Sequence, residues 1–173
     1  AFLIACSPFS YGQYTEWQNF TNGNQINCVT VQGDTTWVGT GGGLVKLRIS
    51  SDTVVFFNKI SSGLPANDVR AVALAADGTK WIATYGGGLA AFDGTNWTVF
   101  DNTNSPLPEN KIVAVVVDTA GQVWVGTETN GIMEFSGTVW TPFNTSNSNL
   151  LGSFVYCMAA DRAGRVWVGT DYG

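Results

Sequence analysis

Trp37-Val38-Gly39-Thr40 is the first of four near-copies of one tetrapeptide in this chain. The others are Trp81-Ile82-Ala83-Thr84, Trp124-Val125-Gly126-Thr127 and Trp167-Val168-Gly169-Thr170. Their tryptophans are spaced 44, 43 and 43 residues apart. A repeat of this length is typical of a β-propeller, in which each repeat forms one four-stranded blade.

The rest of each repeat falls into register around its tryptophan, which lies on the second strand. Apolar segments with a two-residue alternation precede it and are expected to form the first strand, buried on both faces; they are 26–31, 69–74, 112–117 and 155–160. A Gly-rich tip follows the second strand, and a third strand begins at 44, 89 and 132. The fourth strand carries an aromatic or apolar residue and, three positions later, a Phe; these pairs are Trp17/Phe20, Val54/Phe57, Trp97/Phe100 and Trp140/Phe143.

We therefore predict an all-β fold, a β-propeller of four-stranded antiparallel blades made from about four repeats of 43–44 residues within residues 11–173. The predicted strands are a fourth strand from Trp17, three complete sets, and a final first and second strand before Gly173. A stop inside a hairpin would leave strand edges and apolar faces unpaired. We expect the chain to be a fragment of a larger propeller.

Large and small residues alternate on the second strand, and this alternation predicts how the blades stack. Each tryptophan lies on the same face as the small residue two positions later. We expect each Trp to face small residues on the neighbouring blade, and the glycines to let that blade approach closely. The structural residues of the repeat are Trp37, Trp81, Trp124, Trp167, Gly39, Gly126 and Gly169.

The cysteines of the repeats are predicted to be structural. Cys28 and Cys157 occupy the first-strand position that Ala71 and Ala114 hold in the other two copies. A small, partly apolar residue suits such a site, so both are expected in the core. No pair of cysteines has the spacing of metal ligands, and the sequence implies no metal or cofactor.

Residues 1–10 do not match the repeats. Leu3-Ile4-Ala5-Cys6 looks like a bacterial lipobox, with the remnant of a signal peptide before Cys6 and lipidation expected on its thiol. The alternative is a short apolar strand with a buried cysteine. The lipobox predicts an exported protein, periplasmic or on the cell surface, that meets the membrane only through a lipid anchor on Cys6.

Composition and charge exclude several classes of function. The chain has a formal charge of −5 and no basic cluster, which argues against nucleic acid as a partner. It contains no histidine, which excludes histidine-based triads, histidine metal sites and a phospho-accepting histidine. The 13 carboxylates are scattered, so no catalytic residues are assigned.

The second copy carries a motif that resembles a known repeat. It runs Leu64-Pro65-Ala66-Asn67-Asp68-Val69, then Asp77-Gly78, then Trp81-Ile82-Ala83-Thr84 and Gly87-Gly88-Leu89. This pattern resembles the two-component regulator propeller repeat of bacterial sensors, from residue 17 onward. The fourth copy departs from it at Leu150-Leu151-Gly152-Ser153, which lacks the proline. The resemblance implies a sensing or ligand-binding propeller.

One face of the predicted propeller is a candidate binding surface. In an antiparallel meander, the tips after the second strand and the long loops between blades emerge together, and long loops on a rigid scaffold often carry binding residues. The candidate ligand-face residues are Arg70, Tyr85, Glu128, Asn130, Asp171 and Tyr172. Tyrosine and acidic side chains beside Gly-rich backbone can hold a sugar by stacking and hydrogen bonds. The alternative is a set of solvated hairpin tips.

Three functions are compatible with these features. The first is a non-catalytic ligand-binding or sensing propeller of an exported bacterial lipoprotein or sensor, with an oligosaccharide or another cell-surface molecule as its ligand. The second is a propeller-based polysaccharide lyase or hydrolase. The third is a protein–protein interaction scaffold. The sequence does not identify a signalling partner.

Overall fold

The computed structural model describes residues 25–173. The predicted signal-peptide remnant of residues 1–10, lipidation of Cys6 and the strand at Trp17 and Phe20 lie outside the described residues. The described part contains fourteen β-strands and no helix, so none of its elements is a helix able to cross a membrane.

The strands form three four-stranded sheets and one two-stranded sheet, each in chain order and antiparallel. Blade 1 consists of β1 (Ile26–Gln32), β2 (Thr35–Thr40), β3 (Gly43–Arg48) and β4 (Thr53–Phe57). Blade 2 consists of β5 (Val69–Leu74), β6 (Lys80–Thr84), β7 (Gly88–Phe92) and β8 (Trp97–Phe100). Blade 3 consists of β9 (Ile112–Val117), β10 (Val123–Thr127), β11 (Ile132–Phe135) and β12 (Trp140–Phe143). Blade 4 consists of β13 (Val155–Ala160) and β14 (Val166–Thr170).

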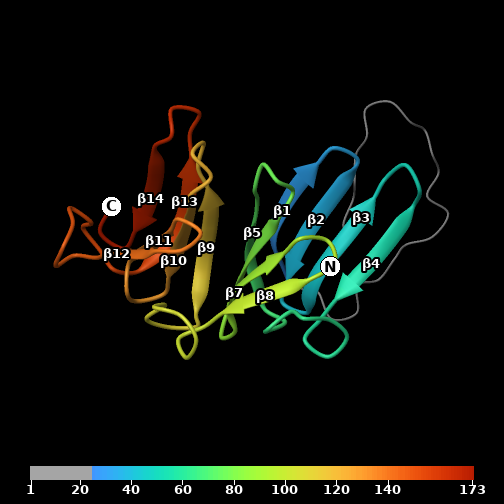
Figure 1. The fold of residues 1–173 in the computed structure, drawn as a ribbon, viewed down its shortest axis with the longest axis horizontal. Helices are drawn as coiled ribbons and strands as arrows, with labels where there is room; N and C mark the ends of the chain where they lie inside the picture. Colours follow the sequence, from blue (N-terminus) through green and yellow to red (C-terminus); the bar gives the residue numbers. More distant parts are fainter. Residues whose placement is uncertain (1–24) are drawn as a thin grey trace.

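These sheets are the blades of a propeller, as predicted. They follow one another through space in chain order, from blade 1 on the right of Figure 1 to blade 4 on the left. The first strands β1, β5, β9 and β13 lie next to one another, so each blade presents its first strand to the same side. The predicted first to fourth strands of the described repeats match these elements.

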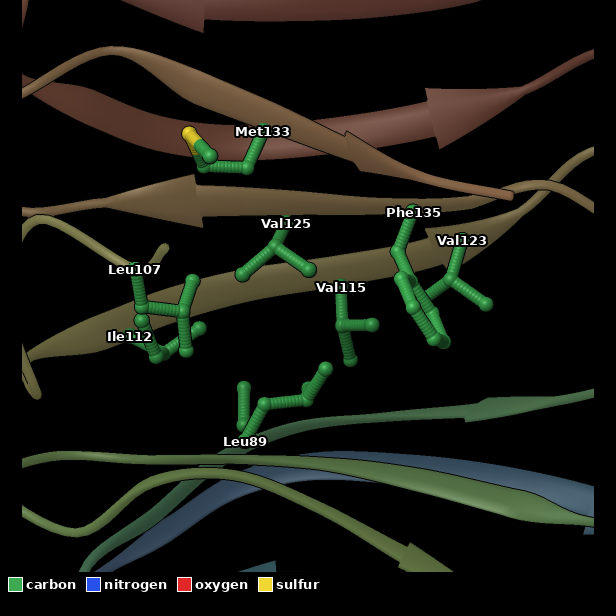
Figure 2. Close-up of a cluster of buried hydrophobic side chains, with 9 residues drawn as sticks. Leu89, Leu107, Ile112, Val115, Val123, Val125, Met133 and Phe135 are labelled. Carbon is green, nitrogen blue, oxygen red and sulfur yellow. The ribbon is translucent and has the colours of Figure 1, made fainter. Parts of the chain in front are cut away.

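The core lies between the blades. Figure 2 shows the cluster between blades 2 and 3, where Leu89 points toward Ile112 and Val115 across the interface. Leu107, from the loop between the two blades, is 3 % exposed and closes one end of the cluster. Burial of this apolar surface between the sheets is the main force that holds successive blades together.

Trp37 and Trp81 of the second strands also lie between blades, but for these two the prediction that they face small residues is wrong. The Trp37 ring stacks on Phe57 of its own blade at 6.1 Å between centroids and meets Phe92 of blade 2 edge-on at 6.2 Å. Trp81 contacts Phe100 at 5.9 Å and Phe135 of blade 3 at 5.7 Å in the same way. The facing strand presents an aromatic ring because the large indole needs a broad apolar surface to cover it.

The small residues of the second strands accommodate a different neighbour. A Cβ atom added to Gly39 would lie 2.7 Å from Cγ1 of Val69 in blade 2, and one added to Gly126 would lie 2.7 Å from Cγ1 of Val155 in blade 4. The absence of a side chain therefore lets the first strand of the next blade approach. Gly169 has only Cys157 of its own sheet nearby, at 2.9 Å from the same added atom.

The prediction that the first strand is buried on both faces holds only where a blade has described neighbours on both sides. Ile112 and Ala114 of β9 are both buried, whereas Val29 of β1 is 53 % exposed and Tyr156 of β13 is 64 % exposed. For the same reason the prediction of a core position is wrong for Cys157, whose side chain is exposed on the outer face of blade 4, where no described blade covers it. Cys28 is half-buried against the core cluster between blades 1 and 2, where burial raises its pKa.

Each first strand contains a β-bulge that the predicted two-residue alternation missed. The register slips once in every copy, between Ile26 and Cys28, Val69 and Ala71, Ile112 and Ala114, and Val155 and Cys157. The extra residues are Asn27, Arg70, Val113 and Tyr156. Since a bulge re-aims the side chain at its extra residue, these four side chains leave the regular alternation of their strands.

Candidate functional site

The candidate ligand-face residues lie at the end of the propeller that carries the loops between blades. Backbone hydrogen bonds hold each tip there to its own first strand, as from Tyr85 N to Asp68 O (2.8 Å) and from Glu128 N to Lys111 O (3.1 Å). The same tips also bond to the next blade, as from Gly86 N to Asn110 O (2.9 Å). This double attachment makes the end of the propeller a rigid platform for side chains.

Tyr85 and Glu128 occupy the same position in successive repeats, and their side chains meet. The Tyr85 hydroxyl donates a hydrogen bond to Oε1 of Glu128 at 2.5 Å, and Lys111 Nζ donates to Oε2 at 2.6 Å. The hydrogen bond from Lys111, and then that from Tyr85, lowers the pKa of Glu128. The hydrogen bond to Glu128, and then the contact with Tyr85, raises the pKa of Lys111. This carboxylate is therefore held ionised and fixed in orientation.

The network continues from Tyr85 to blade 1 through Arg70. The Arg70 guanidinium carbon lies 4.7 Å from the centre of the Tyr85 ring, and Lys111 Nζ lies 5.3 Å from the same centre. Arg70 also donates to Asp68 at 2.6 Å, and Asp68 accepts a hydrogen bond from Asn27 of blade 1 at 3.1 Å. The Tyr85 ring thus has two cationic neighbours, which occupy the surface that a sugar ring would need for stacking on this residue.

Asn130 belongs to a separate group on the tip of blade 3. Its Nδ2 donates to Oε1 of Glu109 at 2.8 Å, and the same oxygen accepts from the backbone N (2.8 Å) and hydroxyl (3.0 Å) of Thr129. Glu109 comes from the loop before β9. These groups are exposed and present amide, hydroxyl and carboxylate atoms to solvent.

Asp171 and Tyr172 lie apart from both groups, on blade 4. Asp171 accepts a hydrogen bond from the backbone N of Phe154 at 3.3 Å, and Tyr172 is 76 % exposed. The bulge residue Tyr156 is also exposed, with its ring 5.2 Å from that of Phe154. The structure therefore brings together Arg70, Tyr85 and Glu128, and leaves the other candidate residues in two further groups.

Sequence reasoning missed Asp68, Lys111, Asn27, Glu109 and Tyr156. Their common signal is position in the repeat, because all five lie within or just before the first strand. Asp68 and Lys111 stand at the same position in successive copies, and Asn27 and Tyr156 share the bulge position of blades 1 and 4. A comparison of polar residues at equivalent repeat positions would have found them. Within residues 25–173, no group of three or more His, Cys, Asp or Glu side chains is arranged to hold a metal ion.

The stacked four-stranded blades define the described chain as part of a β-propeller. The model of the two component regulator propeller family matches residues 106–129 and 149–172. These segments run from the loop before a first strand to the tip after a second strand, in blades 3 and 4. The family that matches these two segments is the one that the sequence resembles. No curated protein matches the sequence.

Several solved propellers have a similar fold. One is the extracellular domain of a protein described as the hybrid two component system BT3049 of B. thetaiotaomicron, with a TM-score of 0.72 and 21% identity over 83% of this chain and 20% of that chain. Another is the virginiamycin B lyase of Staphylococcus aureus (TM-score 0.64, 14% identity, 84% of this chain and 48% of that chain). A third is an ancestral GH74 enzyme (TM-score 0.63, 16% identity, 88% of this chain and 23% of that chain). This chain therefore spans about a fifth of the first of these proteins, and at such identities the likeness concerns the fold alone.

We predict that replacing Lys111 with methionine moves the pKa of Glu128 upward, toward its ordinary value of 4.5. Since the folded-state pKa is lowered, the Glu128 contacts stabilise the protein above the unfolded pKa and are lost as pH falls through the folded one. The side-chain carboxyl carbon shift of Glu128, followed by NMR between pH 2 and 7, measures this change. Tyr85→Phe is expected to move the pKa in the same direction, and an unchanged titration in both variants would contradict the network.

Proposed function

We propose that this chain forms part of the ligand-binding propeller of an exported bacterial sensor or lipoprotein, and that it binds without catalysis. The observation that carries the proposal is the network of Arg70, Tyr85, Lys111 and Glu128, which gathers charged and aromatic groups from successive blades at the loop-bearing end. The two segments that match the two component regulator propeller family support the proposal, because that family is named after two component regulators. The extracellular domain of a two component system with a similar fold supports export.

An oligosaccharide is the ligand class that we propose. The loop-bearing end offers many hydrogen-bonding groups, among them the ammonium of Lys111, the amide of Asn130 and the carboxylate of Glu109. Tyr156 and Tyr172 are the exposed rings at this end on blade 4, so they, rather than Tyr85, would stack on a sugar. Anchoring through a lipid on Cys6 remains part of the proposal.

The test is binding of the full-length protein to an array of neutral and uronic-acid-containing oligosaccharides, followed by titration calorimetry of each hit. We expect the variants Lys111→Ala and Tyr156→Ala to weaken binding by roughly tenfold or more, which corresponds to about 1.4 kcal/mol. Arg48→Ala removes a cation at the opposite end and is the matched control. It should bind like the unmodified protein.

Two results would overturn the proposal in different ways. Absence of binding to every saccharide on the array would reject the ligand class. Release of shortened or unsaturated products from a bound saccharide would replace binding with lyase or hydrolase activity. The anchor is tested separately, by mass spectrometry of protein expressed with its natural leader, since an unmodified Cys6 would reject lipidation.

A further inference from the structure

Lys80 occupies a position that belongs to the apolar core in the next repeat. It pairs with Phe92 across blade 2, just as Val123 pairs with Phe135 across blade 3. Both residues are buried, with 8 % of Lys80 and 3 % of Val123 exposed. Lys80 therefore has a buried stem and places a charged group where the next repeat has an apolar residue.

The ammonium of Lys80 lies between aromatic rings and near a second lysine. Its Nζ is 5.3 Å from the centre of the Trp37 ring and 5.6 Å from that of Phe92. Lys46 Nζ lies 5.5 Å from the centre of the same Trp37 ring. Burial, and then the positive charge of Lys46, lowers the pKa of Lys80. Two cations thus share one indole ring, although like charges repel.

Trp37 adds a third hydrogen-bond donor without an acceptor. Its Nε1 is buried and has no hydrogen-bond partner. The equivalent tryptophans of blades 3 and 4 donate to aspartates in the turn before their own strand, Trp124 to Asp118 at 2.9 Å and Trp167 to Asp161 at 3.1 Å. In blade 1 the turn is shorter and its aspartate, Asp34, accepts from Ser50 instead, so the Trp37 indole N–H keeps its capacity to donate.

Nearby carboxylates do not neutralise the two lysines by direct contact. Asp77 and Asp93 are the acidic groups whose charge acts on Lys80, but each is engaged in its own turn. Asp77 accepts from the backbone N of Thr79, and Asp93 accepts from the backbone N of Thr95 and of Asn96. Among the described residues, neither Lys46 nor Lys80 forms an ion pair or hydrogen bond with a protein group.

We propose that Lys46, Lys80 and the indole N–H of Trp37 form a second binding site, which takes an oxyanion such as a sulfate, phosphate or carboxylate group. An oxyanion bound beside this indole ring would give its N–H an acceptor and relieve the repulsion between the two ammonium groups. The site lies near the turns within the blades, at the end opposite the candidate ligand face, so it does not depend on the function proposed above.

NMR of the indole N–H groups of the full-length protein tests this site. Sodium sulfate, sodium phosphate and sodium acetate are titrated separately at constant ionic strength, maintained with sodium chloride. We expect a saturable shift of the Trp37 indole signal, identified by its loss in Trp37→Phe, with at least one of the three salts. The Trp124 signal, whose N–H is bonded to Asp118, should stay in place. The salt with the tightest binding identifies the group preferred.

Variants copied from the other blades provide the controls. Lys80→Val restores the residue of blade 3, and Lys46→Ala restores Ala91 of blade 2. Each should abolish the saturable shift, while Lys59→Ala, which removes an exposed lysine at the other end, should leave it intact. Circular dichroism of each variant at the temperature of the titration checks that it is folded, so that loss of binding is not attributed to unfolding. A shift that never saturates, or that persists in Lys80→Val, would overturn the proposal.

Discussion

Replacing Trp37 with alanine is expected to lower the free energy of unfolding of the 173-residue chain by about 3–5 kcal/mol. The side chain is 2 % exposed and contacts Phe57 in its own blade and Phe92 in the next. Its removal leaves a cavity between two stacked sheets, where a rigid backbone cannot collapse fully to fill it. Urea unfolding followed by circular dichroism measures the loss.

Trp167 provides a control at the same position of the repeat. Its ring is 60 % exposed on blade 4, and its Nε1 donates to Asp161 at 3.1 Å. Trp167→Ala should therefore change the free energy of unfolding by less than about 1 kcal/mol, as expected for an exposed side chain. Equal losses in the two variants would show that packing between blades is not what makes Trp37 important.

The prediction of the fold from the sequence succeeded because the repeat supplies four independent copies of each signal. A single Trp-Val-Gly-Thr segment could belong to many β-proteins, but four copies in register specify one blade per repeat. The fourth strands were predicted from one signal alone, an aromatic or apolar residue followed by a Phe three positions later. They contain the pairs Val54/Phe57, Trp97/Phe100 and Trp140/Phe143. These signals are local, so they do not depend on how the blades stack.

The β-bulges and the interface between blades were not predictable by the same reasoning. The apolar positions Val69, Val72 and Leu74 contain a step of three residues, which departs from strict alternation and marks the bulge at Arg70. The aromatic partners of Trp37 and Trp81 on the next blade, Phe92 and Phe135, lie more than one full repeat further along the chain. Periodicity within one strand carries no information about which residue the next blade presents.

The candidate site was predicted only in part, for a related reason. Tyr85 and Glu128 were predictable because they are variable positions at the hairpin tips of a repeat. Lys111 and Asp68 were missed because they precede strands and looked like ordinary loop residues. Their role depends on contact with the tip after the second strand, and only the paired geometry of Tyr85 with Lys111 reveals it. The same geometry shows that two cations, Arg70 and Lys111, lie against the Tyr85 ring.

The second large effect is expected at Gly39. A Cβ atom there would lie 2.6 Å from Cys28 Sγ and 2.7 Å from Val69 Cγ1, closer than side chains can approach. Gly39→Ala should therefore destabilise the chain by about 1–3 kcal/mol, the usual cost of overpacking. Gly41→Ala is the control, because nothing lies within 4 Å of the added atom. It should be neutral or slightly stabilising.

Blade 2 indicates how this cost arises and how it can be relieved. There Ala83 pairs with Ala71, whereas in blade 1 Gly39 pairs with the larger Cys28. The double variant Cys28→Ala with Gly39→Ala reproduces the blade 2 pair, so it should recover part of the stability lost in Gly39→Ala, while the contact with Val69 keeps the recovery incomplete. Unfolding free energies of the two single variants and the double variant give the coupling directly. Strict additivity would mean that Val69 alone sets the need for glycine, and that the close approach of blade 2, rather than the pairing within blade 1, selects the residue at this position.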